Sequence, residues 1–450
     1  MRKLEEKYQN HVAVVGVHSG KYLAERVTDR IREASVRLGA THPVLNDRQF
    51  RVWRAYAVRA WPTLVVVDPR GYVAGTQAGE FTAEAIEPFV ERALAAAREA
   101  GTLTAEPLHL RVDVVGTGRR SALRYPGKVA IDDPDSPTPR IAIADTGNHR
   151  VVLGRLGADG RHARVEQLLG GTRGFADGIG VDARFDSPQG MCFDGDRVLY
   201  VADAENHAIR RIDLTTWEVR TIAGTGDQLR TREDLRAGAL SSPWDVTLVG
   251  ETLFVAMAGS HQLWGIETEG RGESAEGRDT QAISPLTPHP SPLRIGSGAE
   301  EIQDGSHSEA ALAQPMGITS AGGRLYFVDA ESSAVRWAHV DPTGRVGTIV
   351  GTGLFHFGDK DGVGDEVRMQ HQQGLTRHRD GRLLVVDSYN DALKWVDPVS
   401  RRAETWLRGF AEPSGVAIGR DLVYVADTNA HRIAVVPLEG GELGELEVDF

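Results

Sequence analysis

The sequence predicts an α/β unit over residues 1–101 and an all-β propeller of six blades over residues 102–450. The propeller is predicted by one motif that recurs six times, each copy reading as four short strands. The α/β unit is predicted by short apolar runs that alternate with amphipathic segments before residue 101.

The first region divides into elements by the spacing of its apolar residues. From residue 21 to 39 they recur at three- or four-residue steps, which predicts a helix with a buried face made of Leu23, Val27, Ile31, Ala34 and Leu38. The remaining expected elements are strands at 12–19 and 41–47, a helix at 48–58, a strand and antiparallel return within 61–80, and a helix at 81–101.

Trp61, Pro62 and Thr63 stand immediately before a buried strand. Together with the order of elements, this motif resembles the thioredoxin-like superfamily. In that family the proline is cis, and the backbone beside it pairs with an extended substrate. The resemblance therefore implies that Trp61, Pro62 and Thr63 form a partner-binding edge.

The chain has one cysteine, Cys192, which excludes internal disulfides, multi-thiolate metal sites and dithiol chemistry. The family's Cys-x-x-Cys and a central strand would both precede the strand at 12–19. We favour a natural start upstream of Met1, and the rival is a degenerate domain whose strands close up. In the apolar stretch GMCF, Cys192 itself is expected to be a small buried hydrophobe.

Each repeat ends one strand at an aspartate and continues through a polar turn into an apolar strand, and in the third copy Met257 stands in the aspartate's place. A second recurring feature, here called the marker, precedes the strand that ends at the aspartate. It is usually a proline followed two positions later by a small or acidic residue. The aspartates are Asp145, Asp203, Asp329, Asp387 and Asp427, and the markers are Pro126 with Gly127, Pro188 with Gly190, Pro243 with Asp245, Pro315 with Gly317, Gln373 with Gly374 and Pro413 with Gly415.

In the second copy the four strands are predicted at 190–194, 197–202, 208–214 and 218–223. Residues 108–115 match the fourth strand of the repeat, so we expect them to close the ring as the outer strand of the sixth blade. Residues 441–450 would then be surplus. The competing assignment makes 442–449 that outer strand.

The turn after the aspartate resembles the NHL repeat, through Asn148-His149-Arg150, Asn206-His207-Ala208, Ser260-His261-Gln262 and Ala430-His431-Arg432. A thioredoxin-like domain followed by a six-bladed NHL propeller resembles the NHL-repeat-containing thioredoxin-family proteins of bacteria and animals. Animal members add a β-stalk after the propeller, of which 441–450 would be a remnant.

The repeated histidines His149, His207, His261 and His431 raise the possibility of a zinc site, since the resemblance extends to propeller lyases that bind zinc. Equivalent positions are spread around a ring, however, so their side chains do not converge on one ion. We expect them to hydrogen-bond the turns of their own blades, and the aspartates to cap those turns. Asp177, Asp304, Asp359 and Asp361 lack the spacing of a calcium loop and are expected to form tight turns.

A formal net charge of −12 argues against nucleic-acid and anionic-membrane binding. No run approaches the roughly 18 apolar residues of a membrane span. We therefore expect a cytoplasmic protein. We also expect a monomer that has no cofactor, no metal and no catalytic residues.

The leading function is a non-catalytic scaffold that binds a protein or a small molecule on a propeller face, beside a redox-inactive thioredoxin-like domain. Two alternatives stay open. One is a protein related to thiol-disulfide oxidoreductases whose dithiol lies upstream of the given start, and the other is a metal-dependent propeller lyase or hydrolase.

Overall fold

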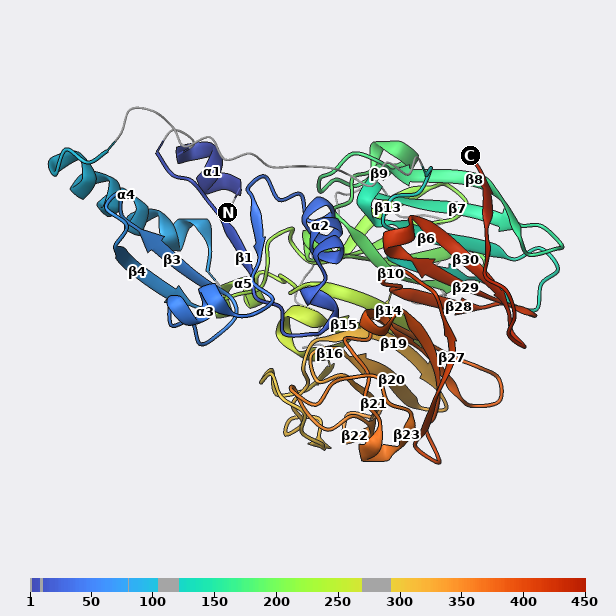
Figure 1. Ribbon diagram of the computed structural model, residues 1–450. Helices are drawn as coiled ribbons and strands as arrows, with labels where there is room; N and C mark the ends of the chain where they lie inside the picture. Colours follow the sequence, from blue (N-terminus) through green and yellow to red (C-terminus); the bar gives the residue numbers. More distant parts are fainter. Residues whose placement is uncertain (1, 9–10, 80, 104–120, 269–292) are drawn as a thin grey trace. The chain divides into compact units, whose positions relative to one another are not determined.

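The computed structural model describes residues 2–8, 11–79, 81–103, 121–268 and 293–450 (Figure 1). The chain divides into two compact units, Met1–Arg119 and Arg120–Phe450. None of the helices in the described ranges has the length and apolar character that a bilayer span needs.

The first unit contains two short sheets among its described residues. One is parallel, pairing Gly16 with Val44, and the other is antiparallel, pairing Thr63 with Ala78. The strands and helices alternate in the expected order. They are α1 (Arg2–Tyr8), β1 (Gly16–His18), η1 (Ala24–Arg26), α2 (Thr28–Arg37), β2 (Val44–Asn46), α3 (Arg51–Ala55), β3 (Thr63–Val67), β4 (Val73–Ala78) and α4 (Ala83–Glu99).

The helix predicted from residue 21 starts only at Thr28. The segment before it forms the short 3-10 turn η1 (Ala24–Arg26), and Val27 is extended (φ −86°, ψ 121°), so the α-helix begins at Thr28. Leu23, Val27 and Leu38 are consequently exposed, which corrects the predicted buried face. Only Ile31 of that face is fully buried.

The core of the first unit lies along α4. Ile86, Val90 and Leu94 recur at helical spacing and pack against Leu4 and Tyr8 of α1. Thr82 caps this helix, because its hydroxyl accepts a hydrogen bond from the Ala85 amide.

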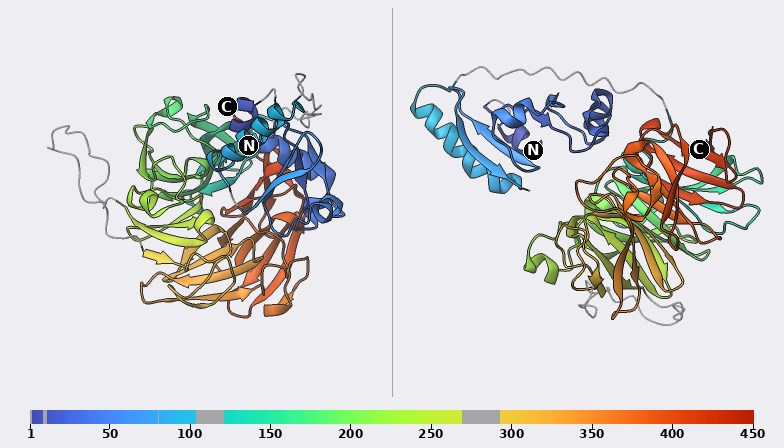
Figure 2. Two further views of the ribbon diagram at one scale, coloured as in Figure 1. Left: turned by 90° about the vertical axis from the view of Figure 1, so that its left-hand side faces the viewer. Right: turned by 60° about the horizontal axis from the view of Figure 1, so that its bottom comes forward.

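The described residues of the second unit form six sheets arranged around a common axis, each with antiparallel blade strands, which confirms the six-bladed propeller (Figure 2). The strands of the second copy are confirmed to within two residues. By blade, the four strands are β5 (Lys128–Ile131), β6 (Arg140–Asp145), β7 (Arg150–Leu156) and β8 (His162–Gly170); β10 (Pro188–Asp194), β11 (Val198–Asp203), β12 (Ala208–Asp213) and β13 (Glu218–Ala223); β14 (Pro243–Val249), β15 (Thr252–Met257), β16 (Gln262–Glu267) and β17 (Leu293–Ile295); β19 (Pro315–Ala321), β20 (Arg324–Asp329), β21 (Ala334–His339) and β22 (Arg345–Val350); β24 (Gly374–Arg377), β25 (Leu383–Asp387), β26 (Ala392–Asp397) and β27 (Arg402–Arg408); and β28 (Gly415–Ile418), β29 (Leu422–Asp427), β30 (Arg432–Pro437) and β31 (Gly444–Glu445).

The glycine-rich connecting segments add a fifth strand to blades two, four and five. Each adds a short strand to the outer edge of the blade that it enters, which covers backbone groups that would otherwise be unpaired. These strands are β9 (Gly178–Ile179), β18 (Gly305–Ser306) and β23 (Gly362–Val363).

Short helical turns connect many of the strands. Five of them follow the second strand of a blade, and the others lie in the connecting segments. They are η2 (Thr146–Asn148), η4 (Ala204–Asn206), η5 (Ala258–Ser260), η7 (Ser388–Asn390) and η8 (Thr428–Ala430), with η3 (Gly180–Asp182), α5 (Arg232–Arg236) and η6 (Gly364–Glu366) in the connections.

The C-terminal segment joins blade six to blade one. Strand β31 pairs with β30 at the fourth position of blade six, and β32 (Glu447–Asp449) pairs in parallel with β8 of blade one. Residues 108–115, expected at the fourth position, lie outside the described residues. The described partner of β30 is β31, which lies within residues 442–449. The pairing therefore agrees with the competing assignment.

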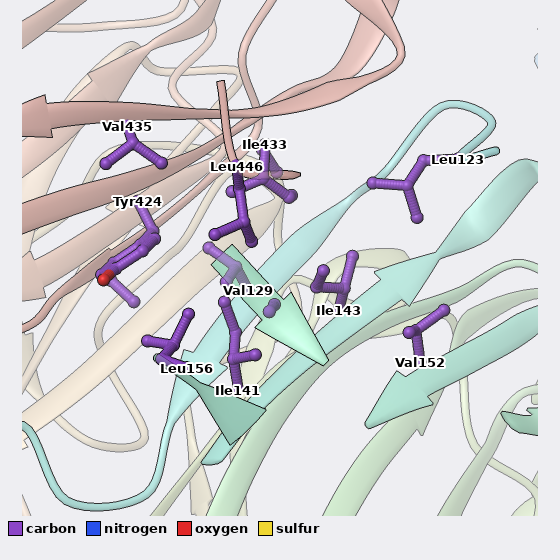
Figure 3. Close-up of a cluster of buried hydrophobic side chains, with 13 residues drawn as sticks. Leu123, Val129, Ile141, Ile143, Val152, Leu156, Tyr424, Ile433, Val435 and Leu446 are labelled. Carbon is purple, nitrogen blue, oxygen red and sulfur yellow. The ribbon is translucent and has the colours of Figure 1, made fainter. Parts of the chain in front are cut away.

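A hydrophobic cluster between the last and first blades accompanies this pairing (Figure 3). Leu446, between β31 and β32, is buried within it. Burying one large aliphatic side chain contributes about 1.5–3 kcal/mol, so the cluster is a major source of ring stability. Its other labelled members are Leu123, Val129, Ile141, Ile143, Val152 and Leu156 from the blade-one side, and Tyr424, Ile433 and Val435 from blade six.

Candidate functional site

The repeated aspartates are buried and hydrogen-bond within their own blades. The Asp203 carboxylate accepts bonds from the Asp186 amide, the Asn206 side chain and the Arg210 guanidinium. Asp145, Asp329, Asp387 and Asp427 each accept an amide bond from the same place in their blades. Burial raises the pKa of Asp203 to about 6 and that of Asp387 to about 7.

A basic side chain accompanies the aspartate in every blade that has one. It comes from the following strand, five or seven residues later. In blade three the acid is replaced by Met257, and Trp264 packs against it in place of a cation. The pairs are Asp145 with Arg150, Asp203 with Arg210, Asp329 with Arg336, Asp387 with Lys394 and Asp427 with Arg432.

The connecting segments supply further carboxylates to the cations of blades two, four and five. Asp177 accepts from Arg210, Asp304 from Arg336, and Asp361 from Lys394. Asp359 is a second acceptor for Lys394. The carboxylates that could have formed a calcium site are therefore bonded to arginine or lysine side chains of the protein.

The repeated histidines bond to the next blade, which corrects the expectation that they bond to their own. The Nδ1 atom of His207, in blade two, accepts from the Ser242 amide, which precedes the first strand of blade three. His149, His261 and His431 accept in the same way from Ser187, Gln314 and Tyr125. Blades four and five use Ser333, which accepts from His371, and Asp391, which accepts from Glu412.

An accepting Nδ1 must be unprotonated, and burial lowers the pKa of His149 and His207. Each of these four histidines adopts a positive φ, between 48° and 56°. The backbone turn thus aims the imidazole across the gap between blades. The histidines are parts of the ring and do not converge on one point.

The centre of the ring holds a buried ion pair that was not predicted from the sequence. Lys128 of blade one reaches Asp245 of blade three, with Nζ 3.0 Å from Oδ2. The same ammonium donates to the backbone carbonyls of Met316 and Gln373, in blades four and five. All three of its protons are therefore bonded.

The strand pairing explains why this level of the ring has room for the ion pair. At the start of the innermost strands, Lys128 and Asp245 occupy the place that glycine takes in the other blades. A Cβ on Gly190 would lie 2.1 Å from Asp245 Oδ1, and one on Gly415 would lie 2.7 Å from the Lys128 Cα. The glycines are Gly190, Gly317, Gly374 and Gly415; Asp245 in place of the marker glycine was the sequence signal for this site.

Above the ion pair, the innermost strands enclose a funnel of about 540 Å³. All six blades contribute, and the lining extends from Lys128 and Asp245 at the floor to Asp132, Arg377 and His378 at the mouth. A cavity of this size is typical of small-molecule sites. The axis therefore carries a blind pocket, and this funnel is the candidate functional site.

In each innermost strand, the residue two positions after the floor residue lines the neck of the funnel. The neck therefore has six side chains. Three adjacent blades contribute threonines, and the opposite three contribute small apolar residues and a thiol. The Thr247 hydroxyl lies 3.1 Å from that of Ser320. The neck consists of Thr247, Thr319, Thr376, Ala417, Ala130 and Cys192.

Cys192 packs against a hydrophobic cluster, as expected for a small hydrophobe, but it is only partly buried and also lines the neck. Burial raises the pKa of its thiol, so the nucleophilic thiolate is disfavoured. Among the described residues, no three His, Cys, Asp or Glu side chains are grouped so that they could hold a metal ion.

In the first unit, Trp61, Pro62 and Thr63 lie at the start of β3, and the Trp61–Pro62 peptide bond is cis. The Trp61 indole donates to the Ser19 carbonyl at 2.7 Å and lies 4.5 Å, centroid to centroid, from Trp53. Trp61 is 47% exposed. Trp61 therefore belongs to an aromatic cluster with Phe50 and Trp53, both of which are partly buried, and no ring contact involves Pro62 or Thr63 among the described residues.

Comparison with known proteins finds the NHL repeat at residues 185–212 and 410–436. Human NHL repeat-containing protein 2 is 34% identical over 98% of this chain, which spans 64% of that protein's length. Protein SUPPRESSOR OF QUENCHING 1, chloroplastic, from Arabidopsis thaliana, is 36% identical over 98% of this chain and 43% of its own length. A solved nidogen/laminin complex matches 67% of this chain and 94% of its own, at 17% identity and a TM-score of 0.43.

Proposed function

Since this chain is an NHL-repeat propeller protein homologous to NHL repeat-containing protein 2, we propose that it is a non-catalytic binding scaffold with its ligand site in the axial funnel. The observation that carries the proposal is the blind end of the funnel. The Lys128–Asp245 pair closes the floor, so a ligand enters and leaves through one mouth.

The side chains of the funnel favour binding over catalysis. The ammonium of Lys128 is bonded to three acceptors, and the thiol of Cys192 is held protonated. The Asp245 carboxylate accepts from Lys128 and from two backbone amides, those of Val246 and Ile318. None of these groups is prepared to attack a substrate or to remove its proton.

The single cysteine provides a test of binding in the funnel. A ligand in the neck covers Cys192, so it slows the reaction of the thiol with a small neutral reagent such as methyl methanethiosulfonate. Replacing Thr319 with Trp fills the neck and is expected to slow the reaction without any ligand. Equal labelling rates in a folded Thr319→Trp variant and the unmodified protein would contradict the position given to the funnel.

We further propose that residues 1–101 are a thioredoxin-like unit without dithiol activity. The support is the order of elements, the cis proline beside β3 and the exposed side chain of Trp61. If this proposal is correct, the protein reduces insulin disulfides no faster than its Cys192→Ala variant. A rate of insulin reduction that depends on Cys192 would contradict the proposal.

A metal-dependent propeller lyase or hydrolase is the alternative function. Elemental analysis of the purified protein distinguishes it from the scaffold. One equivalent of zinc or calcium that survives dialysis would favour the lyase or hydrolase, and its absence favours the scaffold.

A further inference from the structure

The neck of the funnel has two chemically different halves. Thr247, Thr319 and Thr376 come from consecutive blades and form one half. Among the described residues, the hydroxyls of Thr319 and Thr376 have no hydrogen-bond partner. Both hydroxyls are therefore available to a ligand, as donors and as acceptors.

The opposite half of the neck is apolar. Ala417 and Ala130 continue the ring from blades six and one, and Cys192 completes it from blade two. One residue nearer the mouth, Ile131 and Phe193 line the same side. A ligand in contact with both halves needs an apolar body and tolerates a polar edge.

The charges at the mouth are not equivalent. Arg377 lies three residues from the floor along its strand, about 10 Å away at the rise of an extended chain, and its guanidinium has no partner among the described residues. The Oδ1 atom of Asp132 accepts amide bonds from Asp133 and Arg140, which fix this carboxylate on its own hairpin. Asp135 is farther out, in the loop of that hairpin.

Arg379 and His378, the other basic groups of the mouth, are already bonded. Arg379 donates to the Arg420 carbonyl, and His378 lies 3.0 Å from Asp380. Among the charged lining residues above the floor, Arg377 is therefore the one nearest to the floor along its strand, and its guanidinium has no partner among the described residues.

We propose that the funnel binds a small organic molecule with an apolar body in the neck and one anionic end on Arg377. This rests on the proposed function, because it names the ligand class of the same site. A planar guanidinium binds a carboxylate or a phosphate through two parallel hydrogen bonds. The apolar body displaces water from the neck, and the free hydroxyls select ligands with a polar edge.

The test uses three probes with the same eight-carbon chain, namely octanoate, octanol and octylammonium, each below its micelle concentration. The readout is protection of Cys192 in the full chain from methyl methanethiosulfonate, as a function of probe concentration at constant ionic strength. Octanoate is expected to protect at a concentration at least about tenfold lower than octanol, because a hydrogen bond to a charged group is worth roughly that much.

The variant Arg377→Gln removes the charge and is expected to abolish the advantage of octanoate over octanol. The matched control, Arg420→Gln, changes an arginine outside the lining of the funnel and is expected to preserve it. Far-UV circular dichroism and the melting temperature show that each variant is folded.

The outcomes separate the two proposals. Equal protection by octanoate and octanol, or stronger protection by octylammonium, overturns the anionic ligand and leaves the binding funnel intact. No protection by any probe at millimolar concentration overturns both. An octanoate advantage that persists in Arg377→Gln places the anion elsewhere and also overturns the inference.

Discussion

The ammonium of Lys128 lies 3.0 Å from the carboxylate of Asp245, across the axis of the ring, although the two residues are 117 positions apart in the sequence. Both side chains are almost fully buried. This pair joins blade one to blade three and closes the floor of the funnel. Its partners in blades four and five make the centre of the ring a single bonded unit.

Removing one member of this pair leaves the other buried and uncompensated. Lys128→Met or Asp245→Gly is therefore expected to lower the free energy of unfolding by about 3–5 kcal/mol. The double variant has no unpaired charge and is expected to lose much less than the sum of the two. Urea denaturation of the four proteins measures this, and additive losses would contradict a direct interaction.

The buried cation of blade two offers a comparison that the chain itself contains. Blade five carries Lys394 at the place of Arg210, so Arg210→Lys keeps the charge and is expected to cost less than Arg210→Met, although it loses some of the four hydrogen bonds of the guanidinium. Arg210→Met leaves Asp203 and Asp177 without their cation and is expected to cost about 3–5 kcal/mol. Equal losses in the two variants, measured by urea denaturation, would show that the charge is unimportant.

The histidine bonds between blades give the ring a pH dependence on the acid side. Burial lowers the pKa of His207, so its contribution to stability is complete above about pH 6.5 and is lost as the pH falls through the lowered value. Asparagine tolerates the left-handed turn and offers an oxygen acceptor that does not titrate. His207→Asn is therefore expected to show a smaller fall in melting temperature between pH 7.5 and pH 5.

An exposed histidine provides the control for this experiment. His356→Asn changes a side chain outside the contacts between blades and is expected to keep the pH dependence of the unmodified protein. A His207→Asn variant with an unchanged pH dependence would mean that the imidazole does not sense the pH through this bond.

Asp387 gives the opposite pH dependence. Two other carboxylates share the ammonium of Lys394, and burial raises the pKa of Asp387 to about 7. A raised carboxyl pKa gives stability that is complete below about pH 4 and is lost as the pH rises through 7. Between pH 5 and pH 8, the unmodified protein is therefore expected to lose stability relative to Asp387→Asn. A constant difference between the two would contradict this.

Calcium is expected to leave the stability of the propeller unchanged. Arg210, Arg336 and Lys394 occupy the carboxylates that a calcium ion would need. Melting temperatures in EDTA and in millimolar calcium should agree within about 1 °C, because a ligand that does not bind the native state does not stabilise it. A rise of several degrees with calcium would identify a metal-bound blade.

Much of the propeller could be predicted from the sequence because a blade is built from local contacts. The strand order within a blade follows from short connections, and Asp203 meets Asn206 and Arg210 within seven residues. The repetition of that pattern in five of the six copies reveals which residues are buried. The amphipathic face of α4 could be predicted for the same reason, since helical spacing is local.

Helix α2 of the α/β unit could be predicted only in part. The apolar spacing from Leu23 to Leu38 fits a helix, but the chain forms a 3-10 turn at Ala24–Arg26 and is extended at Val27, so α2 begins only at Thr28.

The sequence by itself determined the number of blades and the aspartate that five of the six repeats carry. Only the tertiary structure decided which blade each histidine bonds, that Lys128 and Asp245 meet at the axis, and that the space above them is a funnel with Arg377 free at its mouth. The physical reason is that contacts between blades depend on the rotation that relates them. Residues at equivalent positions of distant copies come together only when the ring closes.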